Sequence, residues 1–166
     1  MRKFIYNSIV ERLKTVEDEN GEQAIKHFDL WNSQVKYAEQ PFGLPAVFLG
    51  FRSINWRLTG NSVREAVVTV ELHVITQRNM PTSSELPCAE TPLDFFDLLA
   101  KINVCLYQYA NRDDRFEHNA LTPVQSTTDH DCGELRDDIE VFECHAVDAS
   151  AMPDLQKKTV KMHLNI

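Results

Sequence analysis

The segment VREAVVTVELHVITQ, residues 63–77, decides the fold because its side chains alternate in character along its length. Five apolar residues occupy every second position: Ala66, Val68, Val70, Leu72 and Val74. Three polar residues fall between them: Thr69, Glu71 and His73. Because successive side chains of an extended chain point to opposite faces, this pattern predicts a long strand with one face buried in a hydrophobic core.

The residues before this segment predict its partner strands. INWRL, residues 54–58, leads into a turn in which Gly60 and Asn61 tolerate a positive φ, so we expect a β-hairpin. AVFLGF, residues 46–51, has the composition of a buried strand, and the two prolines before it argue against a long helix. The aromatic and β-branched residues of 23–37 predict a further strand.

Two other segments have the period of amphipathic helices. In residues 3–17 the apolar positions lie three or four apart: Ile5, Ile9, Leu13 and Val16. In residues 92–110 the expected core stripe is Phe96, Leu99, Ile102, Leu106 and Tyr109. Residues 78–92 hold three prolines and predict a long loop before the second helix.

The last third of the chain is rich in predicted strands. Residues 120–131 contain Pro123, which favours a strand at the edge of a sheet. Residues 136–148 alternate between apolar and polar positions and predict its partner. The C-terminal extension, residues 149–166, alternates again near its end, so we expect a last strand that pairs within this chain or with a neighbour.

The predicted class is α+β: a mostly antiparallel sheet flanked by two helices, in the order α-β-β-β-β-α-β-β with an extended C-terminal strand. Strands and helices do not alternate as they do in parallel α/β folds. A chain of 166 residues is long enough for one domain, residues 1–166, with its own core.

The composition of the chain argues against several classes of function. A formal net charge of −8 argues against a surface that binds nucleic acid by neutralising phosphates. No GxGxxG, GxxxxGK[ST], HExxH or GxSxG motif occurs, so we expect neither an enzyme nor a cofactor. No apolar run approaches the roughly 20 residues that span a bilayer, and charges interrupt the first 14 residues, so we expect no membrane segment and no signal peptide.

Residues 125–148, QSTTDHDCGELRDDIEVFECHAVD, carry several potential metal ligands. A small metal-dependent hydrolase would use His130, Asp131, Cys132 and His145. The spacing is poor for zinc, because ligand pairs usually lie two to four residues apart, and the adjacent Cys144 and His145 of a strand point to opposite faces. The pattern favours a polar turn between two strands. A Cys–His nucleophile or a small-ligand pocket would need a geometry that only a structure shows.

Aromatic residues crowd into positions 31–56: Trp31, Tyr37, Phe42, Phe48, Phe51 and Trp56. Two helices are too few to cover both faces of the expected sheet, so part of this apolar surface is expected to meet another subunit. The residues predicted for such an interface are Trp31, Phe42, Trp56, Val160, Met162 and Leu164.

Five segments in this order carry a resemblance to a known class of protein: FIYNSIVERLK, LPAVFLGF, VREAVVTVELHVITQ, PLDFFDLLAKINVCLYQ and TTDHDCGELRDDIEVFECHAVD. Read as an opening helix, a core strand, a hairpin arm, a central helix and a closing strand pair, they resemble the tail terminator and tail-completion (head–tail joining) proteins of long-tailed bacteriophages. The likeness covers most of the chain. It lies in the order and spacing of elements.

The resemblance implies a structural virion protein of the tail or neck, assembled in the host cytoplasm. It implies a ring, usually a hexamer, that ends polymerisation of the tail tube and joins the tail to the head connector. Its partners would be further copies of itself, the tail-tube protein and the connector or stopper protein. DNA would pass its lumen without sequence-specific binding, past acidic residues for which Glu85, Glu90, Asp113 and Asp114 are the candidates. A head-completion or stopper ring is the alternative.

Overall fold

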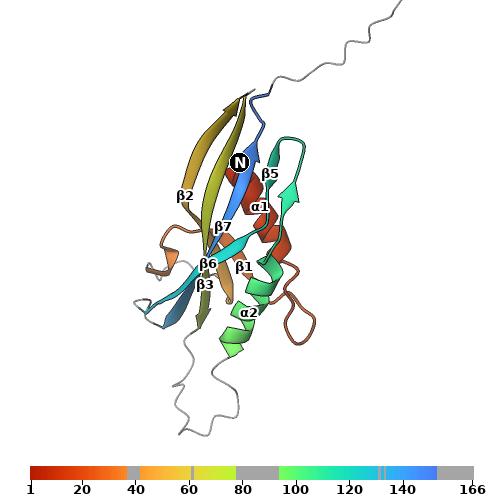
Figure 1. The fold of residues 1–166 in the computed structure, drawn as a ribbon. Helices are drawn as coiled ribbons and strands as arrows, with labels where there is room; N and C mark the ends of the chain where they lie inside the picture. The colour runs from red at the N-terminus through yellow and green to blue at the C-terminus, as the bar shows by residue number, and fades with distance from the viewer. Residues whose placement is uncertain (37–41, 61, 78–93, 131, 133, 153–166) are drawn as a thin grey trace, which may run out of the picture.

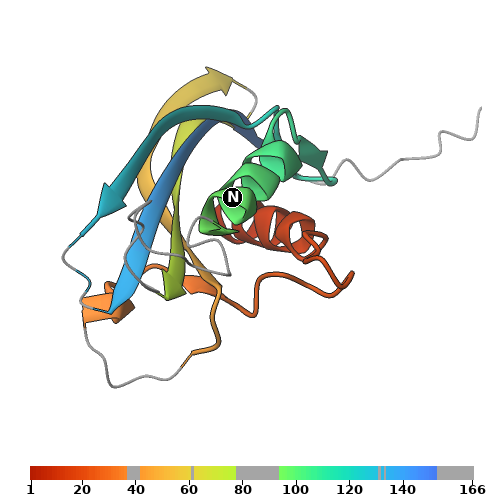
Figure 2. The same ribbon diagram turned by 90° about the horizontal axis from the view of Figure 1, so that it is seen from below.

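The computed structural model describes the chain except for residues 37–41, 61, 78–93, 131, 133 and 153–166. Its helices are α1 (Arg2–Leu13), a short 3₁₀ helix (Gln34–Lys36) and α2 (Asp94–Leu106). Its strands are β1 (His27–Leu30), β2 (Ala46–Gly60), β3 (Val63–Gln77), β4 (Asn111–Arg112), β5 (Phe116–His118), β6 (Thr122–Asp129) and β7 (Leu135–Asp148). Both α-helices pack on one face of a single curled sheet (Figures 1 and 2).

The sheet has the order β1-β2-β3-β7-β5-β4, and β6 also pairs with β7. Among the described strands, every pairing is antiparallel except that of β1 with β2. The curl is strong enough that the Arg52 guanidinium on β2 reaches across β3 and β7 to the Gln125 side chain on β6, at 3.2 Å.

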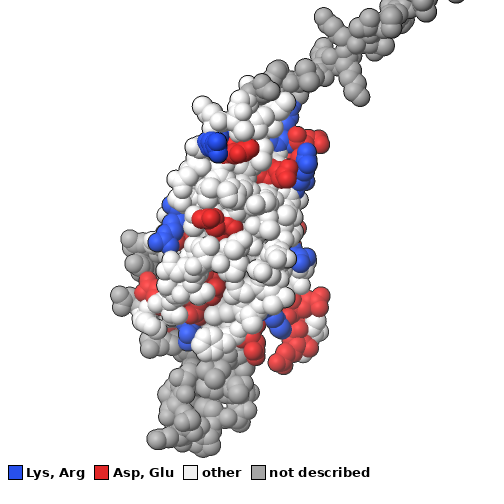
Figure 3. Space-filling view, viewed as in Figure 1, with Lys and Arg blue, Asp and Glu red and all other residues white. Residues whose placement is uncertain are grey.

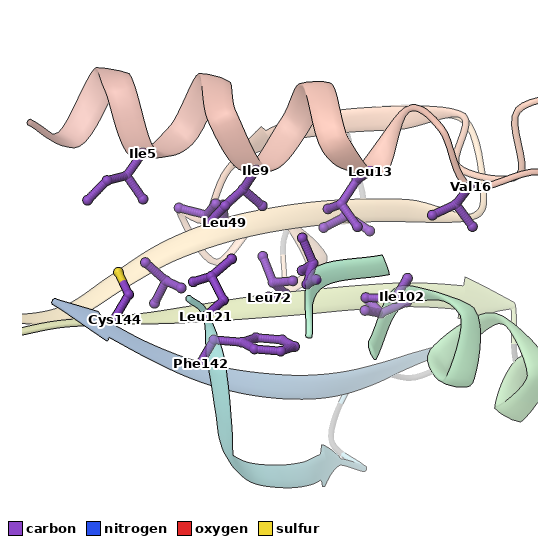
Figure 4. Close-up of a cluster of buried hydrophobic side chains, with 14 of the residues drawn as sticks. Ile5, Ile9, Leu13, Val16, Leu49, Leu72, Ile102, Leu121, Phe142 and Cys144 are labelled. Atoms are coloured by element: carbon purple, nitrogen blue, oxygen red, sulfur yellow. The ribbon is translucent and has the colours of Figure 1, made fainter. Parts of the chain in front are cut away.

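The central strand is β3, as its alternation predicts. It pairs with β2 on one side and with β7 on the other, from Arg64 opposite Asp148 to Gln77 opposite Leu135. The apolar side chains at its even positions are all buried against the helices: Ala66, Val68, Val70, Leu72 and Val74. We call this side of the sheet the helix face. In Figure 4, Leu72 and Phe142 of the sheet lie beneath Ile5, Ile9 and Leu13 of α1.

Helix α1 follows the predicted spacing but ends at Leu13, four residues early. The hydroxyl of Thr15 donates to the Arg12 carbonyl at 2.7 Å, and Glu17 then forms a β-bridge with Gln23. These contacts turn the chain away from the helix axis, yet Val16 is still buried in the core.

Helix α2 buries Leu99, Ile102 and Leu106 as predicted, whereas Phe96 was wrongly placed in the core stripe. The Phe96 side chain is 51% exposed, and Phe95 packs against the core in its place. The guanidinium of Arg136 lies 3.6 Å from the Phe95 ring centre, which holds that ring toward the sheet.

The strand order differs from the predicted one. The two strands expected at 46–51 and 54–58 form one strand, β2, with an irregularity in its register between Phe51 and Ser53. Three strands therefore precede α2, and four follow it. The strand expected over 23–37 is reduced to β1, because Ser33 adopts a positive φ of 57° and the chain then coils into the 3₁₀ helix.

Two predicted features fall where the structure describes little or nothing. The loop at 78–92 lies outside the described residues, and so does the C-terminal extension beyond Met152. Within the described part of the chain, no helix has the length and apolar character needed to cross a membrane.

Replacing Leu72 with alanine tests the central role of β3. Leu72 is fully buried between α1 and the sheet, so Leu72→Ala should lower the free energy of unfolding by about 2–5 kcal/mol. Val104 on α2 is 78% exposed, and Val104→Ala should change it by about 0.5 kcal/mol or less. Urea unfolding followed by circular dichroism measures both values, and equal effects of the two substitutions would contradict this core.

Candidate functional site

The face of the sheet opposite the helices carries a second, smaller hydrophobic cluster. Its buried members are Val35, Ala46, Phe48, Ile75 and Cys132, with Trp31, Phe42, Leu44 and Leu135 partly buried around them. Trp31 and Phe42 were predicted to meet a neighbouring subunit. In this structure much of their surface instead packs within the chain, with the Phe42 ring centre 5.0 Å from that of Phe48.

A buried histidine adjoins this cluster. His73 on β3 is 4% exposed, and its ring stacks on Trp31 with centroids 3.6 Å apart and planes 5° from parallel. Its Nδ1 lies 2.9 and 3.1 Å from the two carboxylate oxygens of Asp137, and its Nε2 lies 3.6 Å from Oε1 of Glu71. Among the described residues, Nε2 is buried without a hydrogen-bond partner.

Asp137 also belongs to a group of three potential metal ligands, which we call the turn cluster. The ligating atoms of Asp129, Cys132 and Asp137 all lie within 4.8 Å of one another. Asp129 ends β6 and stands directly opposite Asp137 of β7 in the strand register, while Cys132 lies in the turn between the strands. Cys132 and Asp137 are buried.

The turn cluster differs from the ligand set predicted for a hydrolase, of which it contains only Cys132. His130 is exposed, and Asp131 lies outside the described residues. His145 is exposed on β7, eight residues beyond Asp137, which is roughly 27 Å along a strand. The three described members of the predicted set, His130, Cys132 and His145, therefore do not converge on one point.

A Ser–His pair lies between α1 and the short strands. The hydroxyl of Ser8 lies 2.8 Å from Nε2 of His118, whose Nδ1 is 2.9 Å from the carbonyl of Asn119. Because Nδ1 faces a carbonyl, it carries the ring proton and donates it, so Nε2 accepts from Ser8. Asn111 donates to the Ser8 oxygen at 3.0 Å. Both members of the pair are almost fully buried, so the contact ties α1 to β5 and offers no exposed nucleophile.

The β2 strand has an open edge, which we call the hairpin edge. In the described part of the chain β1 pairs only with Ala46–Leu49, so residues 50–60 of β2 have a strand partner on the β3 side alone. Trp56 is 46% exposed here, and Leu58 is more exposed still. The guanidinium of Arg64 lies over the Trp56 ring at 4.8 Å and bonds the Asp148 carboxylate at 2.7 Å. The end of the hairpin reaches past the start of α1 (Figure 1).

The β6 strand forms the other open edge, as Pro123 predicts. Among the described strands β6 pairs with β7 alone, with a register irregularity between Pro123 and Gln125. It carries no charged residue from Thr122 to Thr128, and Val124 is exposed. Figure 3 shows wide areas of this side of the molecule without charged side chains. We call this strand the β6 edge.

Two of the four acidic residues proposed for a lumen are described. Asp113 and Asp114 are exposed in the turn between β4 and β5. The Asp113 carboxylate accepts hydrogen bonds from the backbone N–H groups of Arg115 (2.8 Å) and Phe116 (2.6 Å), so it also shapes the turn. The other lumen candidates, Glu85 and Glu90, lie outside the described residues, as do three interface candidates: Val160, Met162 and Leu164.

The buried imidazole of His118 predicts a loss of stability in mild acid. Burial lowers its pKa, partly offset by the bond to the Asn119 carbonyl, so below about pH 6.5 the unfolded chain binds a proton that the folded protein resists. The free energy of unfolding should therefore fall from pH 7 to pH 5. His118→Gln should flatten this slope, and His145→Gln, at an exposed position, should retain it. Urea titrations across this range measure the slope, and a wild-type slope in His118→Gln would refute the assignment.

The thiol of Cys144 should not react in the folded protein. Burial raises its pKa to about 12, with a smaller contribution from Glu143, so the thiolate is scarce at neutral pH. A thiol reagent should count the same number of reactive cysteines in the native wild type and in native Cys144→Ala. After unfolding in urea, the wild type should show one more. A difference between the native counts would show that Cys144 is accessible.

No model of a known protein family matches the chain. None of the curated proteins matches it in sequence either. The described chain has three features that bear on function: two open sheet edges, a buried His73–Asp137 pair and the turn cluster beside it.

Proposed function

We propose that the protein is a structural ring subunit at the head-proximal end of a phage tail, where it ends polymerisation of the tail tube and joins the tail to the head connector. The observation that carries this proposal is the pair of open edges, the hairpin edge on β2 and the β6 edge, which are separated in the sheet by β3 and β7. A ring closed by head-to-tail contacts needs two different patches on each subunit. These edges supply two.

Both edges leave unpaired backbone beside exposed apolar side chains, although Arg52 and Arg57 on the hairpin edge and Pro123 on the β6 edge give partial protection. Isolated proteins blunt their sheet edges with charges or short strands, because unpaired backbone groups recruit other strands. The hairpin edge carries the exposed side chains of Trp56 and Leu58, and the β6 edge has no charge before Asp129. Pairing of the hairpin edge of one copy with the β6 edge of the next would satisfy these backbone groups and bury both apolar side chains.

The negative net charge of the chain is what a ring through which DNA passes would need. The net charge of −8 on each subunit multiplies with the number of copies in a ring, and an acidic lumen repels the phosphate backbone. Asp113 and Asp114 are exposed together and are the described candidates for that lining. In this proposal the partners are further copies of the chain, the tail-tube protein and the connector or stopper protein.

A substitution in the hairpin edge tests the ring. Leu58→Asp places a carboxylate opposite Arg64, which the isolated subunit tolerates, but buries that charge in the proposed interface. The loss should be at least about 2 kcal/mol per contact, or roughly 30-fold in association. Val104→Asp on α2, at a residue that is 78% exposed, is the matched control and should assemble as the wild type does.

Sedimentation velocity over a wide concentration range measures the assembly, and electron microscopy of tail tubes incubated with the protein shows whether it caps their ends. A wild type that remains monomeric and never binds tube ends would overturn the proposal. Binding at the head side of the connector in place of the tube end would make it a head-completion or stopper ring.

A further inference from the structure

We propose that the turn cluster binds one divalent cation of the zinc class through Asp129, Cys132 and Asp137. The three ligands come from the last residue of β6, from the turn and from the first part of β7. Their ligating atoms lie within 4.8 Å of one another. One zinc ion spans at most about 4.4 Å between an oxygen and a sulfur ligand, so binding would draw these atoms together by a few tenths of an ångström. This inference is independent of the ring proposal.

The strand register gives the first reason for a cation. Asp129 and Asp137 are directly opposite each other on the antiparallel pair of β6 and β7. Like charges in that position destabilise a sheet, and here one of them, Asp137, is 1% exposed. The His73 imidazole already faces both oxygens of Asp137, but the like charge of Asp129 across the strand pair is a separate cost. A cation held between the two carboxylates turns this repulsion into coordination.

The buried imidazole beside the cluster gives a second, independent reason. His73 points Nδ1 at both oxygens of Asp137, and the Trp31 ring stacked on it keeps the imidazole in that plane. Carboxylates and imidazoles around bound metals are oriented by such hydrogen bonds. The other ring nitrogen, Nε2, lies 3.6 Å from Oε1 of Glu71, on the side of the ring away from Asp137, and takes no part in the cluster. The contact with Nδ1 therefore fixes the Asp137 carboxylate in place before an ion binds.

The ligand types select the metal. Calcium and magnesium prefer shells made only of oxygen, whereas a thiolate favours zinc and similar softer ions. Zinc accepts sulfur and carboxylate oxygen together, and three protein ligands leave one position for water. On binding, the Cys132 S–H bond breaks, its proton passes to solvent, and the sulfur lone pair forms the bond to zinc, with no change of oxidation state. The bound ion would clamp the turn between β6 and β7.

The test uses the full chain, stripped with a chelator, dialysed against zinc chloride and analysed for bound metal. We expect one equivalent of zinc and a rise in the thermal midpoint on the order of 5 °C at saturation. Cobalt should give a thiolate-to-metal charge-transfer absorption band. Cys132→Ser should abolish the band and the equivalent of zinc, whereas Cys105→Ser, at the partly buried cysteine of α2, should keep both.

Asp129→Asn separates a metal site from a merely structural turn. It removes a carboxylate ligand and keeps the size of the side chain, so the variant should gain no stability from zinc, in contrast to the wild type. Circular dichroism confirms that each variant is folded. The inference is overturned if the wild type binds less than half an equivalent, or if Cys132→Ser or Asp129→Asn binds zinc as tightly as the wild type.

Discussion

The pairing of β3 with both of its neighbours is the constraint on which the rest of the structure depends. From Arg64 to Gln77 each residue of β3 has a partner on β7, and β2 runs along nearly the same length on the other side. This ladder satisfies the hydrogen-bonding groups of the backbone. It also fixes which side chains of β2, β3 and β7 point to each face of the sheet. A shift of one residue would exchange the buried valines for Thr69, Glu71 and His73, so the hydrophobic face fixes the register.

This arrangement of side chains gives the sheet two faces of different character. On the helix face, α1 and α2 cover the apolar side chains, and the buried polar residues Ser8 and His118 are paired with each other. No α-helix covers the opposite face of the described chain, and shorter segments close it (Figure 2). Trp31 covers His73, and Arg52 reaches to Gln125. The buried charges at the turn between β6 and β7 are on this second face, where local rules of sheet stability are broken.

The β6 edge and the turn cluster adjoin each other. β6 ends at Asp129, so a clamp on the turn also sets the path of the edge strand that the ring proposal assigns to subunit contact. In such an arrangement, one part of the fold maintains its shape and another part makes contacts with other molecules. The β3 ladder and helix-face core maintain the shape, and the periphery carries the features that a solitary subunit does not need.

The sequence by itself determined the class of fold, the long central strand, the two helices and the β6 edge, because hydrophobic period and proline position are local properties. It misplaced Phe96, whose exposure depends on how Arg136 holds the neighbouring ring. It also grouped Cys132 with His145, near in number but far apart along β7. Only the tertiary structure brought Asp129, Asp137 and His73 together, because strand register, a pairing between distant residues, decides which side chains share a face.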